Sequence, residues 1–116
     1  MFEKRIIHFE GLVVLLAAIY IYALCGFSWL LFIVLLFAPD LAMVAYAINK
    51  RVGAQIYNLF HTYIISILLV LIGVYLKMDT ILMIGLIWTA HIGMDRMLGY
   101  GLKYETDFKD THIQRL

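Results

Sequence analysis

The chain has 116 residues, of which 65% are hydrophobic and 15% are charged. A water-soluble domain carries about 25% charged residues, so this composition excludes an ordinary soluble domain, and the length excludes two domains. The formal net charge of +1 argues against nucleic acid as a partner. The single cysteine, Cys25, excludes an internal disulfide. We therefore predict one integral membrane domain over residues 1–116.

Long uncharged runs define the expected membrane spans. No charged residue lies between Gly11 and Ala38, and His61 is the only titratable group other than tyrosine between Val52 and Leu76. Both runs exceed the ~20 residues that a spanning helix needs. The pattern predicts an all-α, up-down bundle of four transmembrane helices, because short turns make successive helices antiparallel neighbours. The expected helices cover about 6–24, 29–48, 54–76 and 80–98, with a polar tail at 99–116.

The basic residues predict the orientation of this bundle. In the expected topology they gather at one end: Lys4, Arg5, Lys50, Arg51, Arg96, Lys103, Lys109 and Arg115. Only Lys77 falls at the other end. Because positively charged loops stay on the cytoplasmic side, we expect both termini in the cytoplasm and membrane lipids as the surrounding partners.

Six polar residues interrupt the expected helices near their cytoplasmic ends. They are Glu10, Asp40, Asn58, His61, His91 and Asp95. At ~1.5 Å of rise per residue, Asp40 lies about 12 Å inside its helix, and His61 and His91 lie about 10 Å inside theirs. Ionisable groups are expensive within hydrocarbon, so this layer predicts a functional site in the cytoplasmic half of the bundle.

Imidazole and carboxylate groups in this layer predict a metal site. His91 and Asp95 are four residues apart and lie on one helix face. Pro39 precedes Asp40 and is expected to kink its helix. The mixed nitrogen and oxygen set suits zinc, manganese or iron better than calcium. We expect His61, His91 and Asp40 as ligands, with Asp95 as a further ligand or as a partner that orients a histidine.

The leading functional hypothesis is a metal-dependent hydrolase of a lipid or amphipathic substrate. A bound metal would activate water and polarise the substrate's carbonyl or phosphoryl oxygen. Glu10 is the expected general base, and Arg96 and Lys103 are expected to hold an anionic headgroup. In the tail, His112 is either a lid or ligand of the site or a solvated side chain.

Two other functions fit the same residues. Membrane carboxylates and histidines also serve proton relays, so the chain is alternatively a proton or metal-ion transporter or channel subunit, which would need a homo-oligomer to form a pore. The polar residues alternatively have a non-catalytic, structural role and hydrogen-bond across helices.

Five short segments carry a resemblance to a known family. They are Glu10-Gly11, Ala38-Pro39-Asp40-Leu41, Tyr57 to Tyr63, Ala90 to Tyr104, and the closing Thr111-His112-Ile113. Together they resemble the uncharacterised bacterial membrane family catalogued as domain of unknown function 4260, except that Gln114 replaces the usual glycine after the closing segment. The family's motif positions fall on Glu10, Asp40, Asn58, His61, His91, Asp95, Arg96, Lys103 and His112.

The resemblance implies a small four-helix protein of the bacterial inner membrane, without an established activity. Short histidine, Pro-Asp and Thr-His elements of the chain also resemble, more weakly, those of bacterial inner-membrane proteins described as metal-dependent hydrolases. This likeness agrees with the hydrolase hypothesis, but it covers only short elements.

Overall fold

The computed structural model describes residues 2–38, 49–99, 101–102 and 111–113, which form an all-helical fold. Its helices are α1 (Phe2–Cys25), α2 (Trp29–Leu36), α3 (Lys50–Phe60), α4 (Tyr63–Leu76) and α5 (Asp79–Leu98). No β-strand occurs within these described ranges. Helix α2 ends at Leu36, so the predicted helix 29–48 is interrupted at residues 37–38. Residues 39–48, with Asp40, lie outside the described ranges, and so does Lys103.

Three helical stretches are long and apolar enough to cross a membrane. They are Glu3–Cys25, Lys50–Leu76, which joins α3 and α4, and Asp79–Leu98. Large apolar side chains point outward from these stretches, and Val13 and Leu71 are 63% and 59% exposed. Hydrocarbon matches such a surface, whereas water would leave it as an extended exposed patch. The fold is therefore that of a helical membrane protein.

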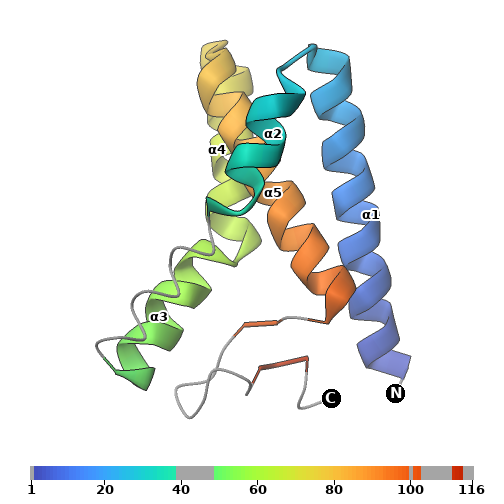
Figure 1. Cartoon of the computed structure of the whole chain (residues 1–116), viewed down its shortest axis with the longest axis vertical. Helices are drawn as coiled ribbons and strands as arrows, with labels where there is room; N and C mark the ends of the chain where they lie inside the picture. The colour runs from blue at the N-terminus through green and yellow to red at the C-terminus, as the bar shows by residue number, and fades with distance from the viewer. Residues whose placement is uncertain (1, 39–48, 100, 103–110, 114–116) are drawn as a thin grey trace.

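Helix α5 is the centre of the described fold, with α1 on one side, α4 on the other and α2 packed across its first half (Figure 1). The buried apolar core joins three helices through Ala18, Tyr22, Phe32, Leu86, Ile87 and Ala90. The start of α1, the end of α5 and residues 111–113 lie at the same end of the molecule (Figure 1). The turns that join α1 to α2 and α4 to α5 lie at the opposite end.

The turn from α1 to α2 is fixed by local chemistry. Gly26 follows α1 with a φ of 70°, a left-handed conformation that costs glycine little. The Ser28 side chain then caps α2 by accepting a hydrogen bond from the Leu31 amide at 3.3 Å. The Tyr22 hydroxyl donates to the Ser28 carbonyl and so ties α1 to this turn.

Two glycines bring the backbones of α1 and α5 into contact. A Cβ atom added at Gly11 would lie 2.5 Å from the Met97 nitrogen and 2.6 Å from the Gly93 carbonyl oxygen. One added at Gly93 would lie 2.8 Å from the Leu15 nitrogen. Small residues allow this close approach of membrane helices. It sets α1 beside the half of α5 that carries the polar residues.

The third predicted helix, 54–76, differs from the structure in two ways. Helix α3 begins earlier, at Lys50, because the Asn49 side chain caps it by accepting from the Val52 amide at 2.8 Å. The helix is also broken at His61 and Thr62, and α3 is inclined to α4 (Figure 1). Neither proline nor glycine lies at the break, so the usual sequence signal of a helix end is missing.

Candidate metal centre

The break between α3 and α4 positions His61. His61 is the residue that ends α3, and its ring stacks on Tyr57 with centroids 3.8 Å apart and planes 4° from parallel. Its Nδ1 lies 2.9 Å from the Tyr57 carbonyl oxygen. Because a carbonyl oxygen can only accept, Nδ1 carries the proton, which in the neutral ring leaves the lone pair on Nε2. His61 is therefore held in the tautomer that binds a metal through Nε2.

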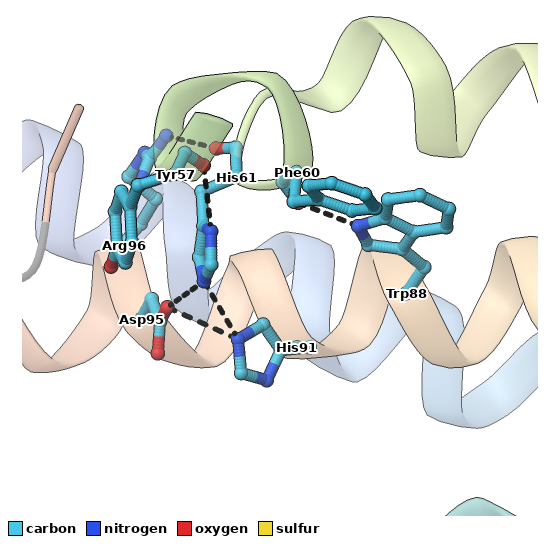
Figure 2. A network of polar contacts seen from close by, with 7 residues as sticks. All are labelled: Tyr57, Phe60, His61, Trp88, His91, Asp95 and Arg96. Atoms are coloured by element: carbon cyan, nitrogen blue, oxygen red, sulfur yellow. Dashed lines mark hydrogen bonds and ion pairs between the residues drawn. The ribbon is translucent and has the colours of Figure 1, made fainter. Parts of the chain in front are cut away.

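Side chains from α5 satisfy the carbonyl groups that the break exposes. Trp88 Nε1 donates to the Phe60 carbonyl oxygen at 2.6 Å, and Arg96 Nη2 donates to the His61 carbonyl oxygen at 2.6 Å. The Phe60 and Trp88 rings also stack, with centroids 5.4 Å apart. Figure 2 shows these two contacts on either side of His61. An interrupted helix is tolerated in a membrane only where such partners replace the lost backbone bonds.

Substitution of Trp88 by phenylalanine tests this role of α5. Phenylalanine at position 88 keeps an aromatic ring against Phe60. The carbonyl oxygen of Phe60 then has no indole N–H to donate to it. We expect a loss of about 1–3 kcal/mol in the free energy of unfolding. Denaturant titration in detergent measures it, and Trp29→Phe is the control because Trp29 is 46% exposed. Equal stability of Trp88→Phe and the wild type would contradict the role assigned to Trp88.

Three donor atoms meet on one side of this scaffold. Nε2 of His61 lies 3.2 Å from Nε2 of His91 and 3.4 Å from Oδ2 of Asp95. The third edge, from His91 Nε2 to Asp95 Oδ2, is 3.3 Å. His91 and Asp95 come from successive turns of α5, whereas His61 reaches them from the break (Figure 2). The three atoms form a nearly equilateral triangle.

The size of this triangle matches tetrahedral metal coordination. Two ligand atoms that each lie about 2.0–2.1 Å from a tetrahedral ion are about 3.3–3.4 Å apart. Neighbouring ligands of an octahedral ion at about 2.1 Å are closer, at about 3.0 Å. The observed edges of 3.2–3.4 Å are nearer to the tetrahedral value. The described residues therefore form a cluster that could hold a metal ion such as zinc through three ligands.

The three side chains are withdrawn from solvent. His61 and His91 are fully buried, and Asp95 is 6% exposed. A buried carboxylate is costly unless a cation, a proton or hydrogen bonds compensate its charge. A divalent ion at the centre of the triangle would supply that charge and would use the imidazole lone pairs as well. The chemistry of the donor set therefore fits a metal.

The remaining predicted site residues are placed elsewhere. Glu10, Arg96 and His112 line a neighbouring pocket of about 270 Å³ and are not members of the donor triangle. Asn58 is half-buried on α3, and its carbonyl oxygen accepts the His61 amide at 3.2 Å. Asp40, a predicted ligand, lies outside the described residues, as does Lys103. The structure therefore brings together three of the four predicted metal ligands.

His112 joins residues 111–113, here called the C-terminal segment, to residues 101–102, which follow α5. Its amide donates to the Leu102 carbonyl oxygen at 2.9 Å, and its Nδ1 accepts from the Leu102 amide at 2.7 Å. The flanking Thr111 and Ile113 are buried. Burial and the nearby positive charge of Arg96 both lower the pKa of His112. The segment is thus held by a neutral imidazole that lines the pocket beside Glu10.

Acidification is expected to release this segment. Because the pKa of His112 is lowered in the fold, this histidine binds more protons in the free segment than in the docked one below about pH 6.5. Docking is therefore fully stabilised above that pH and weakens as the pH falls through the window below it. Amide hydrogen exchange at Leu102, corrected for intrinsic rates, should rise from about pH 7.5 to about pH 5.5. His112→Asn, which accepts a hydrogen bond without titrating, should abolish this rise; a rise that persists would contradict the assignment.

Sequence reasoning missed the residues that support the site. Tyr57 and Phe60 act through their carbonyl oxygens, which carry no residue-specific signal. Tyr63 was also missed, although it lies in the same aromatic run and lines the pocket with Arg96. The three-residue spacing of Trp88 and His91 was the one available signal, because it places the indole on the same face of α5 as the histidine.

These features define a helical membrane protein with a buried His-His-Asp cluster. The chain belongs to the family described as Domain of unknown function (DUF4260), whose model matches residues 4–116. No curated protein and no solved structure matches the chain. The match confirms the family resemblance read from the motifs, and the family's description assigns no activity.

Proposed function

We propose that this protein is a membrane metalloenzyme that hydrolyses an amphipathic substrate. The observation that carries the proposal is the triangle of His61 Nε2, His91 Nε2 and Asp95 Oδ2, with edges of 3.2–3.4 Å. Two histidines and one carboxylate are a ligand set of catalytic zinc sites, in which the fourth position is left for water or substrate. Zinc is the first candidate metal, with manganese and iron as the alternatives.

The protein's own residues would prepare this reaction. Tyr57 fixes the His61 tautomer through its carbonyl oxygen, so the neutral ring keeps its lone pair on Nε2, the corner atom of the triangle. Arg96 and Trp88 hold the backbone at the helix break. When bound, a zinc ion would lower the pKa of a water molecule and polarise a carbonyl or phosphoryl oxygen. Asp40 stays a predicted additional ligand. Glu10, the predicted general base, lines the neighbouring pocket and is not part of the triangle.

We also propose a location and topology for this enzyme. Residues 29–48, which begin with α2, would supply the fourth span, so that both termini face the cytoplasm of a bacterial inner membrane. Lys4, Arg5, Lys50 and Arg51 support this orientation, because they lie near the starts of α1 and α3, at one end of the fold (Figure 1). The metal site would then lie in the cytoplasmic half of the bilayer and within reach of lipid substrates.

A turnover assay with the purified chain tests the proposal. Mixed micelles of acyl esters and phosphoesters are incubated with the protein, and products are identified by mass spectrometry. We expect a chelator to abolish turnover, added zinc to restore it, and Asp95→Asn to be inactive, with Trp29→Phe as the active control. Turnover that is insensitive to the chelator and to Asp95→Asn would contradict a metalloenzyme. Proton or metal flux into liposomes that disappears with Asp40→Asn would instead favour a transporter.

A further inference from the structure

Two cavities on the α1 side of α4 meet at a pair of shared residues. The first, here called the head pocket, has a volume of about 270 Å³ and lies between α1, the start of α4, α5 and the C-terminal segment. The second, the chain groove, has a volume of about 470 Å³ and lies along α1. Glu10 and Tyr63 line both. The two cavities are therefore neighbours, and the head pocket has the more polar lining.

The head pocket offers groups that bind an anion. Arg96 lines it, is 6% exposed, and places its guanidinium carbon 5.9 Å from the centre of the Tyr63 ring. The Tyr63 hydroxyl is buried and has no hydrogen-bond partner among the residues that the structure describes. The Thr62 hydroxyl makes no capping bond with α4. A buried guanidinium beside two hydroxyl groups is a suitable environment for a phosphate.

Glu10 adds a negative charge at the junction of the two cavities. It is exposed and lies inside the candidate span Glu3–Cys25, and no hydrogen bond or ion pair joins it to another described residue. A carboxylate at this depth is stabilised by a cation. Because the same pocket also holds Arg96, the charges of the site are arranged for a ligand that carries both an anionic and a cationic group.

The chain groove offers an apolar path for hydrocarbon. Apart from Glu10 and Tyr63, its lining consists of Ile6, Phe9, Val13 and Val14. Phe9 and Val13 are 66% and 63% exposed on a membrane-spanning helix. The groove is therefore open sideways to the bilayer, and a lipid can enter it without leaving the membrane.

We propose that the head pocket and the chain groove bind a phospholipid whose headgroup carries a phosphate and a primary amine. Arg96 and the Tyr63 hydroxyl hold the phosphate, Glu10 holds the ammonium group, and an acyl chain lies against Phe9 and Val13. The site is independent of the proposed metal, because none of the three metal donors lines either cavity.

Lipid competition with the full chain in detergent tests the proposal. Phosphatidylethanolamine and phosphatidylglycerol with identical acyl chains are offered together, and retained lipid is counted by native mass spectrometry. We expect the wild type to prefer the ethanolamine lipid. In Glu10→Gln the ratio of retained ethanolamine lipid to glycerol lipid should fall about tenfold, because the variant lacks one charge-assisted contact. Tyr63→Phe should weaken both lipids several-fold. Glu3→Gln, an exposed change on the same helix, is the matched control.

Each other outcome overturns a defined part of the proposal. Equal retention of the two lipids by the wild type, or an unchanged preference in Glu10→Gln, removes the role of Glu10. Competition by soluble phosphoethanolamine as strong as that by the lipid would mean that the chain groove is not part of the site. Loss of lipid in a folded His91→Ala variant would place the lipid on the metal centre instead. This variant therefore distinguishes a failure of the lipid site from a failure of the proposed function.

Discussion

Alanine at His91 is expected to reduce bound metal in the purified protein to the background level. His91 supplies one corner of the donor triangle, and its Nε2 lies 3.2 Å and 3.3 Å from the other two donor atoms. Loss of a residue that only supports a ligand costs about 10–100-fold in metal affinity, and loss of a ligand itself should cost more. Asp95→Asn should have a smaller but clear effect, because an amide oxygen is a weaker ligand than a carboxylate.

Elemental analysis and competition with a metal-binding dye measure these losses. His8→Ala is the control, because His8 lies outside the donor triangle near Gly99. Circular dichroism should show that all variants keep their helices. Equal metal content in His91→Ala and the wild type would contradict the metal centre.

Alanine at Gly11 is expected to destabilise the whole fold. The new Cβ atom would lie 2.5 Å from Arg96 Cβ and from the Met97 nitrogen, and 2.6 Å from the Gly93 oxygen. None of these atoms is the end of a flexible side chain, so α1 must move away from α5. Overpacking of this kind costs about 1–3 kcal/mol, and a rigid backbone neighbour places Gly11→Ala at the upper end of that range.

Denaturant-induced unfolding in detergent tests this expectation. Ala17→Val enlarges an exposed residue of the same helix and should leave stability nearly unchanged. Gly11 also lines the head pocket, so Gly11→Ala should weaken lipid retention together with stability. If Gly11→Ala is as stable as the wild type, α1 and α5 do not approach each other as closely as the structure shows.

The membrane character and the three members of the His-His-Asp cluster were predictable from the sequence. Long uncharged runs predict segments that lie in the membrane. Their backbone groups must be hydrogen-bonded within the protein, and helices satisfy this requirement. His91 and Asp95 share a helix face at four-residue spacing, and a similar depth from the helix ends placed His61 near them. Depth and facing are properties of helix geometry, and the structure confirms that these three residues meet.

The break at His61 and the division of the polar layer were not predictable. At the break, Trp88 and Arg96 donate hydrogen bonds to the exposed carbonyl oxygens. Both residues are remote in the sequence and reach these oxygens only after the helices have packed. Glu10 has a depth similar to that of Asp95, but it points into the head pocket instead of the triangle. Depth alone does not fix the direction of a side chain around its helix, so residues of one predicted layer fall into two groups, the donor triangle and the lining of the head pocket.

Zinc K-edge X-ray absorption of the purified, metal-loaded protein tests the metal centre most directly. The structure predicts a shell of nitrogen and oxygen ligands at about 2.0–2.1 Å, with the outer-shell scattering of two imidazole rings. In His91→Ala the zinc signal should fall to the background level, as the metal analysis of this variant also predicts. A spectrum without imidazole scattering, or one that His91→Ala leaves unchanged, would contradict the assignment of His61, His91 and Asp95 as the metal ligands.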